Sequence, residues 1–406
     1  MKLGVVGWSG RPRGVAGEIH QQSGGLVELT ACVEPFDDKY EKGCELGVRP
    51  RRYRTVAEMV AQEQLDGAVI GSPNHCHLEH LQGFAGLSIP ILIEKPLDST
   101  FDKICEVVRF AQGYPGKILV GHCMRYAPIL RAAKKMLDRG DIGSICSTRF
   151  VQNCHYGNGG YHNWRRRKEL SGTWLLEKAT HDFDILLWLL EDVPVRVAAT
   201  QKLQAFGGDK PNDLRCRTCA ERTTCPESMQ NILYRNGHFA MEELSRVKND
   251  LCVYAREADT PDNDLCLFEF ANGVFGTYHQ WFFSPRAYHH RVYEIHGTEG
   301  AMEINLGEQF GGHILVCPRY GMVHDQQKYD FDYLGRNHYN GDGFMAKHFY
   351  LVMRGAEEPF STVDQAFAAE LLGYAGIQAA AEGGFVNPAD LLPPDLSRII
   401  DNPLWT

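Results

Sequence analysis

Leu3 to Gly14 reads LGVVGWSGRPRG, and this stretch decides the fold of the first part of the chain. A short apolar run ends at Gly7, and a glycine-containing loop then leads into a helical stretch. In a dinucleotide-binding fold such a loop carries the pyrophosphate, because glycines let backbone N–H groups approach a phosphate at a helix start. Ser9 stands where a strict G-x-G-x-x-G motif has glycine, and Gly10 predicts a longer loop with the same purpose. An ordinary glycine turn is the alternative.

Working outward from this loop, the chain repeats short apolar runs separated by helical stretches. Such alternation predicts βαβ units and a parallel, doubly wound sheet. We therefore predict an α/β dinucleotide-binding domain over residues 1–125. The further apolar runs lie at 27–34, 67–71, 89–93 and 118–121, and helices are predicted at 55–64 and 100–112, with Ser99 or Thr100 as the cap of the second.

The pattern changes after an amphipathic helix predicted at 128–140. Apolar runs joined by glycine-containing turns predict a large, mostly antiparallel sheet, with helices covering one face. We predict a second α/β domain over 126–406, with a cysteine-containing insertion near 205–255. Its predicted strands are 145–151, 264–270, 273–282, 291–297, 301–305 and 313–317, and its predicted helices are 181–191, 342–354 and 363–383.

Length and composition exclude several classes of protein. With 406 residues, two domains are expected, and 44% apolar with 23% charged residues is typical of a folded globular chain. A net charge of -9 disfavours broad binding to nucleic-acid phosphates. No run of eighteen apolar residues and no signal-peptide pattern occurs, so we expect a cytoplasmic protein with no membrane partner.

Polar side chains follow the second, third and fourth apolar runs, at the edge of a parallel sheet where ligands bind. Glu34 ends the second run, where a carboxylate binds the adenosine ribose and favours NAD over NADP; a solvated acid at a strand end is the alternative. The remaining cofactor-facing candidates come after the third and fourth runs: Ser72, Asn74, His77, Glu94 and Lys95.

Two clusters in the second domain carry further chemistry. Glu177, Lys178 and His181 recur at helical spacing beside a predicted helix start, so they should lie close together. Residues 161–168 read YHNWRRRK, and an inward-facing Arg165 or Arg166 would bind a carboxylate, phosphate or sulfonate through two hydrogen bonds. A solvated charge run is the alternative for this stretch.

Taken together, these segments resemble the glucose-fructose oxidoreductase, inositol dehydrogenase and MocA family (Gfo/Idh/MocA). The resemblance covers nearly the whole chain. It implies a Rossmann domain, a C-terminal α/β domain whose open sheet forms homo-oligomers, and hydride transfer between NAD(P) and a sugar or cyclitol carbon. The motifs that carry it are Glu94-Lys95-Pro96, Ser72-Pro73-Asn74-His75, Arg125-Tyr126-Ala127-Pro128, Gly140-Asp141-Ile142-Gly143, Glu177 to His181, and His296 to Gly300.

The resemblance also implies roles for individual residues. Lys95 and His181 would be the acid/base groups that take the proton as hydride leaves, Glu177 would complete the catalytic set, with Glu177 or Lys178 positioning the substrate, and Arg125 would join the cofactor site. The alternatives are an ion pair of Lys95 with Glu94 and a noncatalytic His181. Many relatives carry Asp at the position of Glu177 and a neutral residue at that of Lys178, which suggests an altered substrate end or proton path. The expected substrate-binding residues are Tyr126, Tyr161, Trp164, Arg165, Arg166 and Lys178.

The insertion contains a C-x₂-C pair, Cys216 and Cys219, followed by Cys225, with Cys252 as the nearest downstream thiol. Thiolates at this spacing chelate tetrahedral zinc, which would hold a loop that has little core of its own. Reduced free thiols are the alternative.

The sequence thus predicts an NAD-dependent oxidoreductase acting on a sugar, glycoside or cyclitol. One alternative is a glycosidase that oxidises its substrate transiently, eliminates the aglycone and returns the hydride, acting on a neutral or an anionic sugar. Another is a noncatalytic NAD or sugar sensor.

Overall fold

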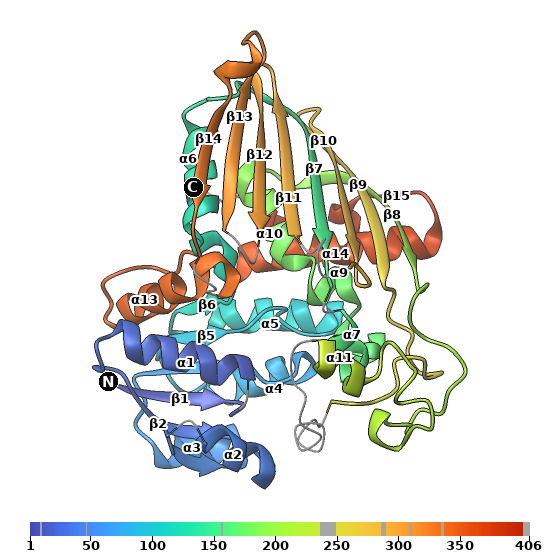
Figure 1. Cartoon of the computed structure of the whole chain (residues 1–406). Helices are drawn as coiled ribbons and strands as arrows, with labels where there is room; N and C mark the ends of the chain where they lie inside the picture. The colour runs from blue at the N-terminus through green and yellow to red at the C-terminus, as the bar shows by residue number, and fades with distance from the viewer. Residues whose placement is uncertain are drawn as a thin grey trace.

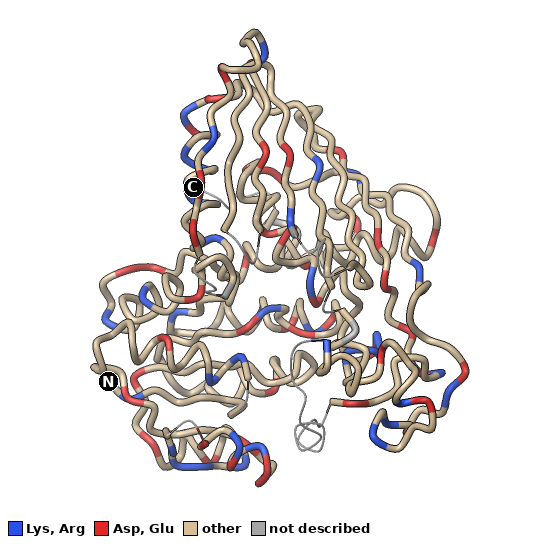
Figure 2. The backbone as a smooth tube through the Cα atoms, viewed as in Figure 1, with Lys and Arg blue, Asp and Glu red and all other residues tan. Residues whose placement is uncertain are grey.

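The computed structural model describes residues 1–8, 10–45, 47–155, 157–235, 249–285, 290–307, 311–333 and 337–400, and in it the chain forms two sheets with helices between and around them (Figure 1). Charges of both signs are interspersed along the backbone (Figure 2). Within those residues, no helix is both long and apolar enough to cross a bilayer.

The N-terminal sheet has six parallel strands in the order β3-β2-β1-β4-β5-β6. This order confirms the predicted doubly wound sheet. The strands are added outward in one direction from β1 to β3 and in the other from β4 to β6, and such sheets bind ligands at the point between β1 and β4 where this order switches. The prediction missed β3, because three residues beginning with two arginines give no apolar signal. The strands are β1 (Lys2–Val6), β2 (Glu28–Val33), β3 (Arg51–Tyr53), β4 (Gly67–Ile70), β5 (Ile91–Ile93) and β6 (Ile118–Val120).

Helices connect these strands close to the predicted places. Thr55 caps α3 through a capping box with Glu58. Thr100 precedes α5 as predicted, but its side chain makes no capping hydrogen bond. The connecting helices are α1 (Gly10–Gln22), α2 (Asp37–Cys44), α3 (Val56–Gln62), η1 (Asn74–Cys76), α4 (His77–Gln82), α5 (Phe101–Gly113) and η2 (Cys123–Tyr126).

The second sheet has nine strands in the order β14-β13-β12-β11-β7-β10-β9-β8-β15. All neighbours are antiparallel except β7 and β10, so the prediction of a mostly antiparallel sheet is confirmed. The strands are β7 (Ile145–Asn153), β8 (Pro194–Lys202), β9 (Asn263–Phe270), β10 (Phe275–Trp281), β11 (His290–Gly297), β12 (Gly300–Gly307), β13 (Gly312–Pro318), β14 (Gln327–Phe331) and β15 (Phe385–Val386).

The helices of the second part join the two sheets. The long helix α14 packs against β8 and α10 on one side and α5 on the other, so it lies between the sheets (Figure 1). Met345 and Phe349 of α13 pack with Leu3 and Val5 of β1, so this helix covers the N-terminal sheet. The longer helices are α6 (Pro128–Asp138), α10 (Thr180–Leu190), α13 (Gly341–Met353) and α14 (Val363–Glu382).

Between β7 and β8, and between β8 and β9, the chain forms short helices and an insertion. The insertion follows β8 and shares a small apolar cluster with Tyr161, Trp174 and Phe282. The short helices are α7 (Asn158–Tyr161), η3 (Trp164–Arg166), α8 (Lys168–Ser171), α9 (Trp174–Glu177), η4 (Cys216–Thr218) and α11 (Met229–Arg235), and nearer the C-terminus come η6 (Val323–Asp325), η7 (Asn337–Asn340), η8 (Pro388–Leu391) and η9 (Ser397–Ile399).

Candidate active site in the crevice between the two parts

A cavity of about 380 Å³ lies where the carboxyl ends of the parallel strands face the segment from α7 to α10. The N-terminal part contributes loop residues after β4 and β5, and the second part contributes α7, α9 and the start of α10. The lining residues are Arg11, Gly71, Ser72, Asn74, His77, Glu94, Lys95, Gly157, Gly159, Gly160, Asn163, Arg165, Trp174, Glu177, Lys178, His181, Phe282 and His338.

The loop after β1 fits a dinucleotide. Gly7 adopts φ +90°, and a Cβ there would come 3.3 Å from the carbonyl oxygen of Gly71. Gly10 begins α1 at φ +44°, and a Cβ there would meet nothing within 4 Å, so the helix start is open to a phosphate. The buried Nη2 of Arg11 has no hydrogen-bond partner among the described residues, which suits an anionic group nearby. Ser9 lies outside the described residues.

Glu34 ends β2 at the place that the sequence predicts, and its side chain is turned inward. It is 3% exposed, and its carboxylate accepts hydrogen bonds from the backbone N–H groups of Trp8 at 3.2 Å and Phe36 at 3.3 Å. The alternative of a solvated acid is therefore wrong. The carboxylate is held against the phosphate-binding loop, which agrees with a role at the ribose.

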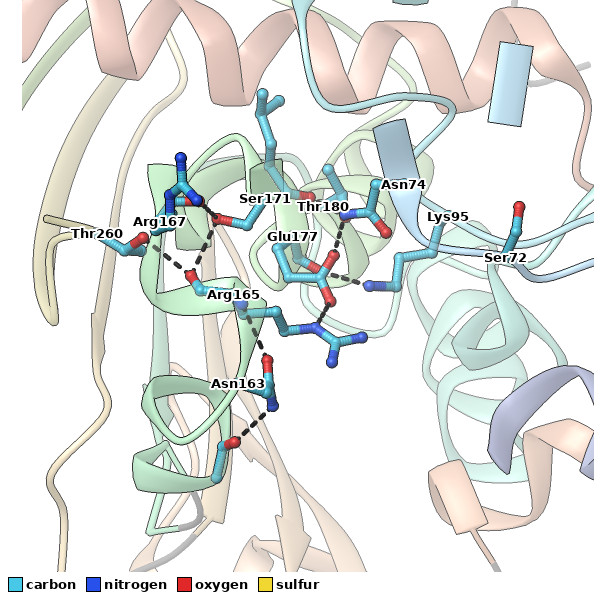
Figure 3. A network of polar contacts seen from close by, with 12 residues as sticks. Ser72, Asn74, Lys95, Asn163, Arg165, Arg167, Ser171, Glu177, Thr180 and Thr260 are labelled. Atoms are coloured by element: carbon cyan, nitrogen blue, oxygen red, sulfur yellow. Dashed lines mark hydrogen bonds and ion pairs between the residues drawn. The ribbon is translucent and has the colours of Figure 1, made fainter. Parts of the chain in front are cut away.

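Glu177 is the centre of a polar network that joins the two parts of the chain (Figure 3). Its carboxylate accepts hydrogen bonds from Asn74 Nδ2 at 2.5 Å and from Arg165 Nε at 2.6 Å. The ammonium of Lys95 donates to the backbone carbonyl of Glu177. Lys95 thus points across the crevice, and the alternative in which it pairs with Glu94 is wrong.

The charges around Glu177 keep its carboxylate ionised. Burial alone would raise its pKa, but the positive charges of Lys95 and Arg165 and the hydrogen bond from Asn74 lower the pKa to about 2. At neutral pH Glu177 therefore carries a negative charge, which suits a residue that anchors two cations better than one that releases a proton.

Glu94 is engaged by Arg11 instead. Arg11 Nε lies 2.8 Å from Glu94 Oε1, and Arg11 Nη1 lies 2.6 Å from Asp342 Oδ2. Asp342 in turn lies 3.0 Å from Nδ1 of His338. Arg11 therefore connects α1, the end of β5 and the start of α13 beneath the crevice.

Histidines form the other wall of the crevice. His181, at the start of α10, is 3% exposed, and burial together with the nearby charges of Lys95 and Lys178 lowers its pKa well below its ordinary value. Burial also lowers the pKa of His338 to about 4, although Asp342 acts in the opposite direction. Both rings are therefore neutral at pH 7, and a neutral imidazole can accept a proton.

Cys123, His181 and His338 are the one group of metal-ligand side chains in the described residues whose ligand atoms lie within 4.8 Å of one another. The charges of Lys95 and Lys178 at His181, and of Arg11 at His338, oppose a divalent cation there. We assign no metal to this group.

His77 and Ser72 have mainly structural contacts, although both line the cavity. The two ring nitrogens of His77 lie 2.8 Å from the carbonyl oxygen of Pro96 and 2.9 Å from that of Ser72. His77 therefore ties the loop after β4 to the loop after β5, where the Lys95-Pro96 peptide is cis. The Ser72 hydroxyl contacts Nδ1 of His80 at 2.8 Å.

Two predicted residues lie outside the crevice near η2. Arg125 is fully buried and makes two hydrogen bonds of 2.7 Å to Asp184, so it is held away from the cofactor loop by an internal ion pair. Tyr126 is 2% exposed and lines a different cavity, beside His348 and Phe360. The predictions of a cofactor contact and a substrate contact for these two residues are not borne out.

Two further substrate predictions fail because the side chains face the insertion. Tyr161 donates its hydroxyl to the carbonyl oxygen of Thr260 at 2.8 Å and lies in a buried apolar cluster. Arg166 is 1% exposed and pairs with Glu257, so the guanidinium that faces the crevice is that of Arg165. Trp164 does not line the cavity among the described residues, but its ring supports the Arg165 guanidinium at 4.5 Å.

Sequence reasoning missed several residues of the crevice. His338 itself adopts left-handed backbone with φ +48°, and nothing in its sequence pattern marks it. Trp174 and Phe282 supply the aromatic walls, but an aromatic residue in an apolar run looks like core. Arg11 follows Gly10 at the start of α1. A cationic residue at the helix start after a glycine loop is a signal from which the sequence analysis could have predicted a site residue.

The geometry defines a class of protein: a two-part α/β protein whose doubly wound parallel sheet has the strand order of a dinucleotide-binding domain. Residues 1–122 match the model described as "Oxidoreductase family, NAD-binding Rossmann fold", and residues 130–303 match the "GFO/IDH/MocA C-terminal domain". The chain belongs to the Gfo/Idh/MocA family of oxidoreductases and carries that family's NAD-binding Rossmann domain.

Individual relatives are more distant. The rhizopine catabolism protein MocA of Rhizobium meliloti is 23% identical over 221 residues, which is 52% of this chain and 64% of that protein. The 2,7-anhydro-N-acetylneuraminate hydratase of Mediterraneibacter gnavus is 25% identical over 282 residues, 68% of this chain and 60% of that protein. The match therefore spans less than two thirds of these curated relatives.

A solved structure shares the fold over almost the whole length. It is a levoglucosan dehydrogenase in complex with NADH and levoglucosan, with a TM-score of 0.76 and 16% identity, covering 95% of this chain and 99% of that one. At this identity the likeness concerns the fold.

Proposed function

We propose that this protein moves a hydride between NAD and a hydroxyl-bearing carbon of a sugar, glycoside or cyclitol. One observation carries the proposal: Lys95 from the Rossmann domain and His181 from the second part line the same cavity, beside the loop that follows β4. Relatives whose names refer to anhydro-sugars and inositol support a polyhydroxylated substrate.

The cofactor side of this reaction is assigned to the loops after β1, β2 and β4. Gly7, Gly10, Glu34 and Ser72 would hold the dinucleotide, which supplies the hydride acceptor or donor when bound. The Nη2 group of Arg11, which has no hydrogen-bond partner among the described residues, would donate to an anionic part of it.

The substrate side needs a group that takes the hydroxyl proton. The imidazole of His181 is neutral at pH 7, so it can accept that proton, and because burial lowers its pKa it would release the proton again readily. The ammonium of Lys95 would hydrogen-bond the same oxygen and stabilise negative charge that develops there. Glu177 holds Arg165 at the mouth of the site through its carboxylate and receives Lys95 at its backbone carbonyl.

The walls of the cavity suit a carbohydrate. Trp174 and Phe282 stack at 4.3 Å between ring centroids and line the cavity with the edge of a buried apolar cluster, which would border the C–H groups of a sugar. Asn163, Arg165 and Lys178 offer polar groups to its hydroxyls, and the two cations would also accept an anionic sugar.

A substrate panel tests the proposal. The purified protein is incubated with NAD and with sugars, glycosides, anhydro-sugars and cyclitols, while nicotinamide absorbance and free sugar are followed together. We expect NADH to form in step with an oxidised sugar. Binding of NAD with no turnover of any member, and no NADH-driven reduction of the corresponding ketones, would favour a sensor instead.

A second candidate is a redox-neutral reaction in which the sugar is oxidised, a group is eliminated, and the hydride returns. The observation that favours it is His338, a further proton-transfer group whose ring lies 5.4 Å from that of His181, centroid to centroid. An elimination needs a base and an acid beyond the pair that a dehydrogenase uses. Release of free sugar with substoichiometric NAD and no net NADH would identify this reaction.

The predictions of a homo-oligomer and of a cytoplasmic location stay predictions. Sedimentation of the purified protein would test the first and fractionation of cells the second.

A further inference from the structure

We propose that Cys216, Cys219, Cys225 and Cys252 form a tetrathiolate site for one zinc ion, and that this site holds the insertion against the segment that carries Arg165. The site lies outside the crevice and goes beyond the proposed function. Its chemistry is structural, because four protein ligands leave no open position on a tetrahedral ion.

The four thiols come together in space although they are spread over the insertion. All four line one cavity of about 20 Å³, together with Arg222 and Tyr254. A space of that size holds about one water-sized body. The cavity therefore suits a single ion and excludes an organic ligand.

The local backbone brings the four cysteines to one cavity, and since no three of their sulfurs lie within 4.8 Å of one another in the described residues, a bound ion would draw them closer. Cys216 and Cys219 bracket η4, with the N–H of Cys219 donating to the carbonyl oxygen of Cys216 at 3.3 Å, so both side chains emerge from one tight turn. Backbone N–H groups of Met229 and Tyr254 hydrogen-bond the sulfurs of Cys216 and Cys252. Such outer hydrogen bonds orient metal-binding thiolates and support their charge.

His162 lines the same cavity but is not available as a ligand. Its Nδ1 lies 2.6 Å from the carbonyl oxygen of Leu251, and its Nε2 lies 2.9 Å from that of Glu227. The sulfur of Cys216 is 4.0 Å from Nδ1. Both ring nitrogens are thus occupied by carbonyl oxygens, which leaves the four sulfurs as the ligand set.

Polar contacts such as those of Arg215 and Arg217 with Asp250 also hold the insertion, but its apolar core is small. In the described residues it contributes Phe206 and Val253 to the buried apolar cluster that it shares with Tyr161 and Trp174, and Ala205 and Tyr254 pack against that cluster. A segment with so small a core is commonly held by a metal or by disulfides. All thirteen cysteines are free thiols.

The metal site also borders the predicted substrate segment. Arg166 donates to the carbonyl oxygen of Cys252 at 2.9 Å and to that of Asn212 at 2.6 Å. Leu251 N–H donates to the carbonyl oxygen of His162 at 3.2 Å. The segment 162–166 is therefore attached to the insertion on both sides of Arg165, which reaches Glu177 in the crevice. A loosened insertion should release Arg165.

Metal analysis tests the proposal without any substrate. Protein purified with a thiol reductant and without a metal-affinity tag should contain about one zinc per chain by inductively coupled plasma mass spectrometry. Cys219→Ser should lose at least four fifths of it, whereas the matched control Cys146→Ser, at an exposed thiol of β7, should keep it. Cobalt exchanged into the wild-type protein should show a sulfur-to-cobalt charge-transfer band.

Limited proteolysis provides a second readout in case Cys219→Ser does not fold. Removal of the metal from the folded wild-type protein with a chelator should speed cleavage within residues 205–255 at least tenfold, and added zinc should restore resistance. If the proposed function also holds, the stripped protein should show a higher KM with a smaller change in kcat. Metal-free wild-type protein with four titratable thiols, a disulfide between any two of them by mass, or full zinc retention in Cys219→Ser would overturn the proposal.

Discussion

At the scale of single residues, the crevice is organised by one ionised carboxylate. Glu177 is 7% exposed, yet it faces three polar partners, and their combined effect exceeds the cost of burying its charge. The sequence placed Glu177, Lys178 and His181 together because they recur at helical spacing. It gave no means of telling which of Arg165 and Arg166 faces the crevice, since adjacent residues of one charge run point in different directions.

Replacing Lys95 by alanine should lower kcat/KM by about a thousandfold, because it removes the ammonium that stabilises the reacting oxygen. NAD affinity, measured by calorimetry, should change less than threefold. Lys135→Ala, at an exposed position of α6, is the control. Wild-type kinetics in Lys95→Ala would remove this residue from the mechanism.

Replacing Arg165 by alanine should raise KM about tenfold or more, since a hydrogen bond to a charged group contributes about 1.5 to 3 kcal/mol. The effect on kcat should be smaller, because this contact binds substrate and transition state alike. Arg167→Ala is a matched control, as its guanidinium pairs with Glu169. Equal KM values for both variants would place substrate recognition elsewhere.

At the scale of elements, the positions of strands could be predicted from the sequence where hydrophobic periodicity is strong. Strands β1, β4 and β7 lie within a few residues of their predicted places. Strands β8 and β14 were missed because Arg196 in one and Lys328 in the other interrupt the apolar runs on exposed faces. Strands near the edge of a sheet have fewer buried positions, so their periodicity is weaker.

Two glycine replacements in one strand-loop-helix unit should have opposite effects on stability. Gly7→Ala forces an alanine to φ +90° and should cost about 1 to 2 kcal/mol of unfolding free energy. Gly17→Ala, in the exposed middle of α1 with nothing within 4 Å of the new Cβ, should add up to about 1 kcal/mol. Urea unfolding measures both, and a stabilising Gly7→Ala would contradict the described loop.

At the scale of the whole molecule, several buried histidines couple stability to pH, with His122 and His181 among them. His122 is fully buried, and burial lowers its pKa to about 4; burial also lowers the pKa of His181. In the unfolded chain both return to about 6.5. Below pH 6.5 the unfolded state therefore binds more protons, and stability falls as the pH falls.

We expect the free energy of unfolding to drop by about 2 kcal/mol per buried histidine between pH 7.5 and pH 5. His122→Gln should flatten this dependence, whereas His324→Gln, at a side chain that is 79% exposed, should leave it unchanged. Thermal unfolding across this pH range provides the measurement. A pH dependence that is identical in His122→Gln and the wild-type protein would show that His122 is not held neutral.

The two-sheet architecture of the molecule could be predicted from the sequence more readily than the residues of the crevice. Both sheets and their order of appearance came from local patterns, whereas the crevice depends on contacts between distant segments, such as Asn74 with Glu177 and Arg11 with Asp342. Local periodicity carries no signal for such pairs. Resemblance to a family located Lys95 and His181, but Arg125 and Tyr126 show that a shared motif also contains residues that only support the fold.

The most direct test of the whole account is a crystal structure with NAD and a substrate found in the panel. We predict that one carbinol oxygen of the sugar lies within hydrogen-bond distance of both Lys95 Nζ and a ring nitrogen of His181, with the nicotinamide against the same carbon. A sugar bound elsewhere, or a carbinol that reaches neither nitrogen, would contradict the account.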